Sequence, residues 1–354
     1  MTRRSAQTLS QEDWQVWLVA QGQPAFRAKQ LIRQLHVRGA TSFEEMSDLP
    51  AALRAKLSEA FEIEQLTEVT TQRAQDGTEK TLFKLPSGRH IETVLIPGFD
   101  ETGAAQRITI CVSSQVGCAM GCTFCATGRM GFHENLAAWM IHEQVRFMDR
   151  RAHEVFGRGV SNVVFMGMGE PLLNYDQVKT AIDYLQHPDG LHLGRKRITV
   201  STVGLARRIR KLADERLPAR LAVSLHASLP QKRSDIMPVN RTEDSDLPHL
   251  VAALRYYVET TGEQVTYEYC LFDQFNDGKE DAQALASIVR KAPGKVNIIL
   301  YNPVEGVAQA RIREERLNAF VSYLVALDVR VTVRRSRGLD IDAACGQLAD
   351  RIAS

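Results

Sequence analysis

The stretch Cys118-Ala119-Met120-Gly121-Cys122-Thr123-Phe124-Cys125 holds three thiols within eight residues. It follows an apolar run at 108–112 that has the composition of a β-strand. Glycines on either side allow the loop to curl, and they are Gly117, Gly121, Gly128 and Gly131. Thiolates are soft ligands, and this spacing lets all three converge on one iron–sulfur cluster. A four-iron cluster held by three cysteines leaves one iron free to bind a further ligand.

Two other interpretations of the three cysteines stay open. Zinc prefers four closed ligands in a structural site, so Cys111 or His133 would have to supply the fourth. Neither residue has the paired spacing of a zinc ribbon or finger. Three buried thiols without a metal are the other alternative, but a glycine-rich loop is a poor place for core packing. The cluster is therefore the preferred hypothesis.

Beyond residue 107 the chain alternates between strand patterns and helical patterns. Strands are predicted at 108–112, 162–166, 198–201, 221–225, 265–271, 296–300 and 329–333. Helices are predicted at 136–148, 175–185, 206–213, 247–260, 282–292 and 312–326. Such alternation implies an α/β fold with a parallel sheet and right-handed crossovers, either an open sheet or a full or partial barrel. Ligands in these folds gather at the carboxyl ends of the strands.

The residues before this alternation divide into two parts. Residues 1–62 have the pattern of short helices, with a helix start at Ser10-Gln11-Glu12-Asp13. From 63 to 106 the pattern is strand-like, with turn signals at Asp76-Gly77 and Ser87-Gly88. We therefore predict three units: a small N-terminal helical domain, 1–62; a short strand-rich connection, 63–106; and an α/β domain, 107–354.

Composition limits the class of protein. With 44% hydrophobic and 24% charged residues, the 354-residue chain has the composition of an ordinary globular protein. The net charge of +2 is too small to indicate nucleic acid, so local basic clusters must carry that inference. We expect no membrane partner, because no apolar run approaches the roughly 18 residues of a membrane helix. Six cysteines, most of them close together, indicate a cofactor site in a reducing compartment, and we expect a cytoplasmic protein.

The cysteine spacing, with an aromatic residue directly before the last cysteine, resembles the motif of the radical S-adenosylmethionine (SAM) superfamily. The resemblance implies a partial (β/α)6 barrel in which Cys118, Cys122 and Cys125 hold a [4Fe–4S] cluster. It further implies that the free iron chelates the methionine portion of SAM. One electron from the cluster would then cleave the sulfonium and produce a 5′-deoxyadenosyl radical.

The stretch Phe165-Met166-Gly167-Met168-Gly169-Glu170-Pro171 follows a predicted strand. Its glycines, Gly169 among them, allow close approach of the backbone to a ligand, and Glu170 offers an acceptor for an ammonium group. It resembles the Gly-Gly-Glu element of the superfamily, with a methionine inserted between the glycines. Later predicted strands end on further groups that we expect to contact the cofactor: Ser201, Ser224, Leu225, His226 and Asn302. Each alone is more often a satisfied turn residue, but several strand ends that face one way favour a binding site.

The C-terminal stretch Asp340-Ile341-Asp342-Ala343-Ala344-Cys345-Gly346-Gln347-Leu348 contains one cysteine. Spacing alone is equally compatible with a small core residue. Together with the run Cys111-Val112-Ser113-Ser114-Gln115-Val116-Gly117-Cys118, however, this tail closely resembles the RlmN/Cfr family of RNA methyltransferases. The likeness extends from the N-terminal helices to the last residues.

In that family, the resemblance implies two SAM molecules per turnover and a methyl group carried on Cys345 as a covalent intermediate. The radical would remove a hydrogen atom from this S-methyl group, and the resulting carbon radical would add to the adenine ring. Cys111 would release the product by forming a transient disulfide with Cys345. Glu92 matches the proton-accepting glutamate of the family, although a solvent-facing glutamate in an alternating strand is ordinary. Cys270 matches no motif, and we assign it to the core.

Basic residues that could neutralise RNA phosphates form three groups: Arg195, Lys196 and Arg197; Arg207, Arg208, Arg210 and Lys211; and Arg334, Arg335 and Arg337. The target base would be extruded from a loop to reach Cys345. The stretches Gly169-Glu170-Pro171 and Arg335-Ser336-Arg337-Gly338 favour the branch that methylates adenine carbon 2 in 23S rRNA and tRNA over the carbon-8 branch. The resemblance also implies a flavodoxin-type electron donor, and a monomer is the default expectation.

Two alternatives from other classes remain. A zinc-stapled RNA-binding protein without catalysis would be colourless and would hold one zinc. A radical enzyme with a small-molecule substrate explains the three cysteines and Glu170 equally well, but it leaves Cys345 and the basic clusters without a role.

Overall fold

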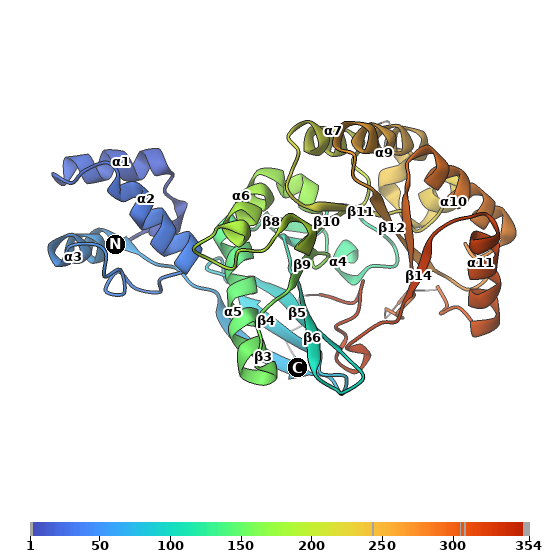
Figure 1. Ribbon diagram of the computed structural model, residues 1–354, viewed down its shortest axis with the longest axis horizontal. Coiled ribbons are helices and arrows are strands. Elements are labelled where there is room, and N and C mark those ends of the chain that lie inside the picture. The colour runs from blue at the N-terminus through green and yellow to red at the C-terminus, as the bar shows by residue number, and fades with distance from the viewer. Residues whose placement is uncertain (1–2, 243, 305, 308, 350–354) are drawn as a thin grey trace.

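The computed structural model describes residues 3–242, 244–304, 306–307 and 309–349. Its main feature is a ten-stranded sheet whose strands curve around one side of a cavity (Figure 1). In their order across the sheet, the strands are β14 (Val331–Arg334), β13 (Gly294–Leu300), β12 (Val265–Leu271), β11 (Arg220–Ser224), β10 (Ile198–Thr202), β9 (Asn162–Phe165), β6 (Ala105–Cys111), β5 (His90–Phe99), β4 (Glu79–Lys84) and β3 (Thr67–Arg73). From β14 to β6 all pairings are parallel, and from β6 to β3 they are antiparallel.

Each crossover between parallel strands passes through a helix on the outer side of the sheet (Figure 1). These helices are α5 (Ala138–Phe156), α6 (Tyr175–Gln186), α7 (Ala206–Asp214), α9 (Leu247–Thr261), α10 (Lys279–Lys291) and α11 (Glu314–Ala326). Apart from the separate β7–β8 hairpin between β6 and β9, each parallel strand lies beside the next one along the chain, with one of these six helices in each crossover. The predicted partial (β/α)6 barrel is confirmed. Helix α5 runs eight residues past its predicted end at 148, because Met148 and Ala152 keep one face buried while charged residues lie on the other.

Some short elements were missed by the sequence patterns. They are the hairpin of β7 (Gln115–Gly117) and β8 (Phe132–Asn135), the short helices α4 (Ala126–Arg129) and α8 (Pro230–Ile236), and the helical turns η1 (Ala6–Thr8), η3 (Pro171–Asn174), η4 (Arg195–Arg197), η5 (Pro238–Arg241) and η6 (Leu339–Ile341). Elements of this length cover too few residues to produce a hydrophobic period. The helical turn η2 (Arg33–Arg38), by contrast, lies in a stretch whose apolar residues repeat at helical spacing. Two of the missed elements, the hairpin and α4, frame the cysteine loop.

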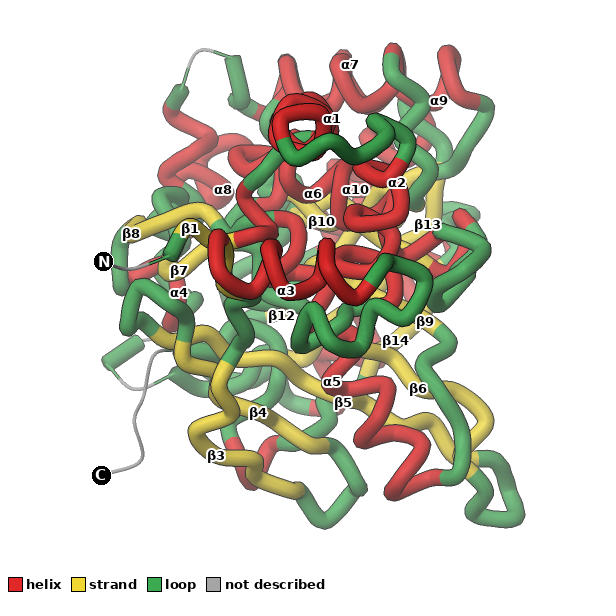
Figure 2. Tube along the Cα trace, turned by 90° about the vertical axis from the view of Figure 1, so that its left-hand side faces the viewer, coloured by secondary structure: helices red, strands yellow, loops and turns green. Residues whose placement is uncertain are grey.

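The N-terminal residues pack on a core of their own. Helices α1 (Gln11–Ala20), α2 (Arg27–Ile32) and α3 (Ala51–Ala60) stand to one side of the sheet, beside α5 and α6 (Figures 1 and 2). A two-stranded pair, β1 (Arg4–Ser5) with β2 (Phe61–Glu62), joins the two ends of this unit. The predicted helix start is confirmed, because Ser10 Oγ accepts from the Asp13 amide and the Asp13 carboxylate accepts from the Ser10 amide.

The predicted strand-rich segment continues the barrel sheet, since β5 pairs with β6 and Val94 lies opposite Cys111. Residues 91–95 of β5 are buried on both faces of the sheet. Thr93 faces α5, where its hydroxyl donates to Gln144 Oε1 at 2.7 Å. Glu92 faces the C-terminal segment, where one of its carboxylate oxygens accepts from the Ala349 amide at 2.8 Å. The alternation in β5 therefore separates two covered faces, and the solvent-facing alternative for Glu92 is wrong.

The C-terminal segment, residues 338–349, spans the open side of the sheet from β14 back to the β3–β4 hairpin. The Gly338 amide donates to Asp76 Oδ2 and the Gln75 amide donates to Asp340 Oδ2, both at 3.0 Å. The antiparallel strands thus provide the surface on which this segment is anchored.

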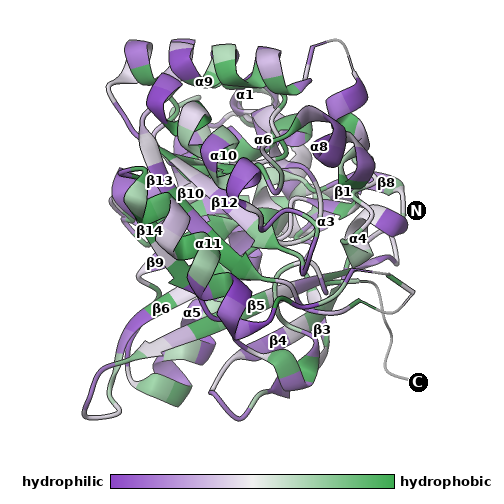
Figure 3. Ribbon diagram, turned by 90° about the vertical axis from the view of Figure 1, so that its right-hand side faces the viewer, coloured by the Kyte–Doolittle hydropathy of each residue, from purple (hydrophilic) through white to green (hydrophobic). Residues whose placement is uncertain are grey.

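Helices on the outside of the barrel have one buried and one solvent-facing side. Helix α9 buries Leu250, Leu254 and Tyr257, and its ribbon alternates between hydrophilic and hydrophobic in Figure 3. In the described part of the chain, none of the helices has both the length and the apolar composition that a membrane span requires.

A buried polar network joins α5 to the end of β6. Gln144 Oε1 accepts from the Thr93 hydroxyl and the Ser113 amide, and Gln144 Nε2 donates to the Ser113 carbonyl at 3.1 Å. The Ser113 hydroxyl in turn donates to the Glu92 carbonyl and accepts from the Met168 amide. One amide side chain therefore holds the start of the cysteine loop against β5.

We predict that Gln144→Leu lowers the free energy of unfolding by roughly 2–4 kcal/mol, because buried groups that lose their partner cost about 1–3 kcal/mol each. Denaturant unfolding measures this change. Gln283→Leu, at an exposed position of α10, is the matched control and should change stability by less than about 0.5 kcal/mol. Equal effects of both substitutions would contradict the structural role of Gln144.

Candidate active site

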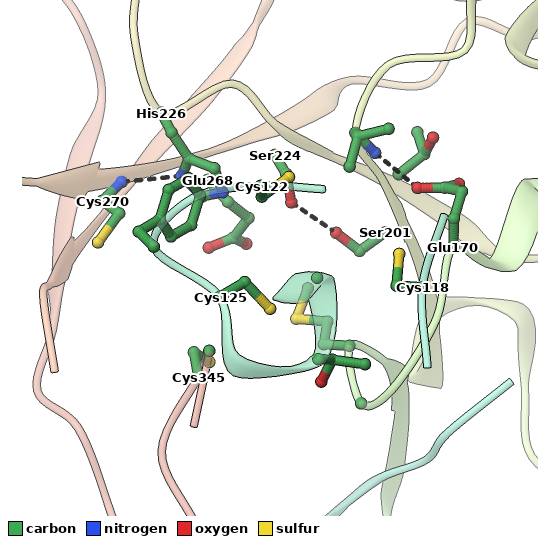
Figure 4. Close-up of a pocket in the computed structure, with 18 of the residues that line it drawn as sticks. Cys118, Cys122, Cys125, Glu170, Ser201, Ser224, His226, Glu268, Cys270 and Cys345 are labelled. Carbon is green, nitrogen blue, oxygen red and sulfur yellow. Dashed lines mark hydrogen bonds between the residues drawn. The ribbon is translucent and has the colours of Figure 1, made fainter. Parts of the chain in front are cut away.

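The cysteine loop leaves the carboxyl end of β6 and curls between the β7–β8 hairpin and α4. Gly117 makes the turn possible: it adopts φ +71°, and a Cβ there would lie 1.9 Å from the Gly131 carbonyl oxygen. The Cys118 amide donates to that same oxygen at 2.8 Å. Cys118, Cys122 and Cys125 all line one cavity, whose empty volume is about 960 Å³ with its open mouth included (Figure 4).

The donor set of this loop fits an iron–sulfur cluster with an open position. Burial raises the pKa of the Cys118 thiol to about 12 and that of Cys122 further, so cluster binding must displace thiol protons. The two candidates for a fourth zinc ligand lie elsewhere among the described residues. His133 is exposed on β8, and Cys111 lines a second cavity instead. Three thiols without a fourth protein ligand are the arrangement that leaves one iron free.

Glu170 lies where β9 ends, next to the cysteine loop. Its carboxylate accepts from the Val203 amide at 2.9 Å and from the Leu172 amide at 3.0 Å. Burial raises the pKa of this carboxyl to about 7, although the two amides oppose the shift. A cationic ligand in the cavity would favour its ionised form. Gly169 allows this close packing, since it adopts φ +100° and a Cβ there would lie 2.5 Å from Gln115 Cβ.

The methionine between the two glycines has a packing role. Met168 is fully buried, and the Glu92 amide lies 3.4 Å from its sulfur. This departure from the Gly-Gly-Glu pattern therefore links the Glu170 loop to β5.

Most of the polar strand ends predicted as cofactor ligands face the same cavity. Ser201 and Ser224 lie side by side, with 3.4 Å between their hydroxyl oxygens (Figure 4). His226 also lines the cavity, and its Nδ1 accepts from the Cys270 amide at 3.1 Å. Burial lowers the pKa of this imidazole to about 3, so the ring is neutral.

Two of the predicted ligands differ from this group. The Leu225 side chain is packed in the hydrophobic core, and Leu225 lies between Ser224 and His226, which line the cavity. Asn302 follows β13 and is 1% exposed, and neither polar atom of its amide has a hydrogen-bond partner among the described residues. An unpaired buried amide of this kind can bind the edge of an adenine ring.

Cys345 lies between two cavities. It is exposed, lines the main cavity with the cluster cysteines, and also lines a second cavity of about 530 Å³ that contains Cys111. The segment around it is anchored to the cysteine loop: the Ala126 amide donates to the Gly346 carbonyl, and the Thr127 hydroxyl donates to the Leu348 carbonyl. Both Cys111 and Cys345 are free thiols.

Glu92 is 3% exposed and its two carboxylate oxygens have different partners. Lys80 Nζ lies 2.9 Å from Oε1, and the Ala349 amide donates to Oε2. Burial raises the pKa of this carboxyl in spite of the lysine. Glu92 is thus held beside the segment that carries Cys345.

Two residues at the site were missed by sequence reasoning: Glu268 of β12 lines the main cavity, and Lys80 pairs with Glu92. Cys270 is packed in the core, as predicted, and also lines the main cavity. Arg334, which was predicted to contact phosphates, lines the second cavity. Cys345 is the main cause of a raised pKa at Arg334, with Glu268 and Cys111 adding to the effect. Lys80 and Glu268 are charged residues within otherwise apolar strands, which is the signal that could have indicated them.

The basic residues predicted to contact phosphates do not form one surface. Arg195, Lys196 and Arg197 precede β10, so they lie at the amino end of the strands, opposite the cavity. On α7, Lys211 pairs with Asp176 and Glu215, and Arg207 pairs with Asp244. Arg334 and Arg337 line the second cavity beside Cys345.

The chain is similar to known proteins over its whole length. The Radical SAM superfamily matches residues 112–286, and the Ribosomal RNA large subunit methyltransferase N-terminal domain matches residues 7–63. A protein of Salinibacter ruber named "Probable dual-specificity RNA methyltransferase RlmN" is 53% identical over 98% of this chain and 94% of its own. A protein of Cytophaga hutchinsonii with the same name is 43% identical over 98% and 93% of the two chains. The crystal structure of a radical SAM methyltransferase from Sphaerobacter thermophilus matches with a TM-score of 0.87 and 42% identity, over 98% of this chain and 100% of that one.

We predict that Cys122→Ala removes most of the iron and acid-labile sulfide from anaerobically purified protein, because a ligand is lost. Cys270→Ala is the matched control, since Cys270 is buried at the same cavity but lies outside the cysteine motif. It should keep the wild-type metal content. Iron and sulfide assays together with the visible absorption spectrum measure both. Loss of iron in Cys270→Ala, or its retention in Cys122→Ala, would contradict this ligand set.

Proposed function

The chain belongs to the RlmN family of radical SAM methyltransferases, and on that premise we propose that it methylates carbon 2 of adenosine in 23S rRNA and tRNA. The observation that carries the proposal is the position of Cys345. It shares one cavity with the three cysteines of the loop and a second cavity with Cys111. A methyl-carrying thiol needs access to both a radical source and a resolving thiol.

The residues of the main cavity suit a cluster and SAM. Cys118, Cys122 and Cys125 would hold a [4Fe–4S] cluster, which together with SAM supplies a 5′-deoxyadenosyl radical. Glu170 and the backbone at Gly169 would bind the amino group of the methionine portion. Ser201, Ser224 and His226 of the cavity lining, with the backbone at Leu225, would contact its carboxylate or ribose. Asn302 follows Tyr301 of the lining, and its unpaired amide would bind the adenine.

Cys345 would take part in two steps, methyl transfer to its sulfur and removal of a hydrogen atom from the S-methyl group. Each step would consume one SAM molecule, so one turnover would require two. Its sulfur first accepts a methyl group by displacement. The S-methyl group would then lose a hydrogen atom to the radical, and the methylene carbon would add to the adenine ring. After the ring carbon loses its proton, the one electron left over would pass to the cluster. Attack of the Cys111 thiolate on the Cys345 sulfur would then form a disulfide and break the bond between that sulfur and the methylene carbon, which would take up a proton and become the methyl group of the product. Burial raises the pKa of the Cys111 thiol to about 12, and the charge of Arg334 opposes that shift.

Glu92 would accept the proton that leaves the ring carbon. Its raised pKa and its position beside the Cys345 segment support this role. Lys80 would hold the carboxylate in place, and its positive charge would favour the ionised form of Glu92 once the proton has left to solvent.

RNA would reach the cavity from its open mouth. We propose that the N-terminal helical domain, 1–62, guides the RNA, that 63–106 carries the proton acceptor, and that 107–354 performs the radical chemistry. Arg334 and Arg337 are placed to meet phosphates next to the extruded base. A flavodoxin-type protein would donate the electron, and the protein would act as a monomer.

We expect reconstituted protein to convert adenosine in unmodified 23S rRNA and tRNA to 2-methyladenosine that carries two deuteriums, when supplied anaerobically with reductant and SAM bearing a CD3 methyl group. One deuterium leaves with the radical. Nucleoside mass spectrometry of each RNA measures the product. Detection of 8-methyladenosine would instead assign the chain to the carbon-8 branch, and retention of three deuteriums would mean direct methyl transfer.

We predict that Cys345→Ala abolishes methylation and keeps the cluster, because the two cysteine sites are separate. Cys111→Ala should stall with RNA attached covalently through Cys345, since the resolving thiol is missing. Gel analysis for a protein–RNA adduct and iron assays measure these outcomes. Free turnover by Cys111→Ala would rule out its resolving role, and loss of iron in Cys345→Ala would make Cys345 a ligand or a structural residue.

A further inference from the structure

Glu268 is a buried carboxylate to which the proposed function assigns no role. It lies in the middle of β12, is 3% exposed, and lines the main cavity. Charged side chains are almost never this deeply buried unless they are paired.

Only half of this carboxylate has a partner. Asn297 Nδ2, on the neighbouring β13, donates to Glu268 Oε1 at 3.0 Å. Oε2 is buried and has no hydrogen-bond partner among the described residues. Burial raises the pKa of the carboxyl, although Arg334 and Asn297 oppose the shift. A buried acceptor without a partner requires an explanation such as a bound ligand.

The position of the carboxylate indicates which ligand it meets. Glu170 and Cys118 lie at one side of the cavity, where the methionine portion of SAM is proposed to bind (Figure 4). The Glu268 carboxylate lies toward the other side, with Cys125 and Cys345 (Figure 4). Charges on Cys345 and on Glu268 both raise the pKa of Arg334. Glu268 therefore lines the same cavity as Cys125 and Cys345, which the target base would enter, and its Oε2 is the oxygen without a partner there among the described residues.

Resting on the proposed function, we infer that Glu268 accepts a hydrogen bond from the 6-amino group of the target adenine and thereby selects adenosine. An amino group is a donor and matches the unpaired oxygen, whereas the 6-oxo group of guanine or hypoxanthine is an acceptor and would face it unfavourably. The adenine of SAM carries the same amino group. That ring would instead be bound by Asn302, whose side-chain amide is also unpaired.

The test uses a short RNA hairpin that contains the adenosine methylated by wild-type protein. Three versions carry adenosine, purine riboside without the amino group, or inosine with a 6-oxo group at that position, and affinity is measured with the reconstituted holoprotein. Wild type should bind the adenosine RNA about tenfold to a hundredfold more tightly than the inosine RNA, as expected for a hydrogen bond to a charged group. The purine RNA should fall between them.

Glu268→Gln should reverse this order. Asn297 donates to Oε1, so a glutamine would turn its oxygen toward Asn297 and its NH2 group into the cavity. That donor matches the 6-oxo group, and inosine RNA should then bind more tightly than adenosine RNA. A misfolded variant cannot produce such a reversal. Glu259→Gln, at an exposed position of α9, is the matched control and should keep the wild-type order.

Two results would overturn the inference. In the first, Glu268→Gln lowers the affinity for all three RNAs by the same factor. In the second, it raises the SAM concentration needed for half-maximal 5′-deoxyadenosine formation without RNA and leaves the order of the RNAs unchanged, which would assign the carboxylate to the adenine of SAM. In both cases wild type still methylates RNA, whereas failure of the proposed function would leave wild type without a methyladenosine product.

Discussion

Two buried or partly buried carboxylates hold the segment that carries Cys345 in place. Within the described residues, the strands from β14 to β3 leave the barrel open, and residues 338–349 cross that opening. Asp76 accepts the Gly338 amide at 3.0 Å and Glu92 accepts the Ala349 amide at 2.8 Å, so each end of the segment is tied to the antiparallel part of the sheet. Cys345 itself is exposed in a loop, and its position between the two cavities depends on these anchors.

The parallel strands determine where the remaining groups meet. Every crossover returns the chain to the same edge of the sheet, so the residues that follow β6, β9, β10 and β11 reach one cavity although they are far apart in sequence. The loop glycines then allow backbone and side chains to approach closely at that edge. Gln144 secures the arrangement from behind through Ser113, which contacts both β5 and the Glu170 loop.

The interior of the barrel raises the pKa of three carboxyls, and burial is the first cause in each case. Their partners differ. Glu170 has only backbone amides, Glu92 has a lysine and one amide, and Glu268 has one amide group and a free oxygen. Because burial disfavours the ionised form of each, a ligand that supplies a cation or a donor is bound more strongly there than in water. Burial also raises the pKa of the three thiols of the cysteine loop, Cys118, Cys122 and Cys125.

Local sequence patterns were sufficient to predict the parallel strands at the core of the fold. The strand at Val265–Leu271 was predicted with its exact bounds, because a run of apolar and aromatic residues between two turn signals reports a buried strand directly. The three cysteines and the Glu170 loop could also be predicted from the sequence, because their motifs consist of residues only a few positions apart. Elements of only a few residues, such as α4 and the β7–β8 hairpin, are too short to show a hydrophobic period in the sequence.

The surroundings of individual side chains were decided by tertiary structure alone. Glu92 has the pattern of a solvent-facing residue, and it is buried because a segment 257 residues later in the chain covers that face of β5. Arg195 to Arg197 belong to a basic cluster in the sequence, yet chain direction places them at the end of the barrel away from the cavity. In the sequence, Glu268 is one more charged residue in an apolar strand, and only the fold leaves one of its oxygens unpaired in a cavity that Cys345 also lines. Spacing along the chain determines which chemistry is available, whereas burial and pairing depend on contacts between segments whose separation no local pattern records.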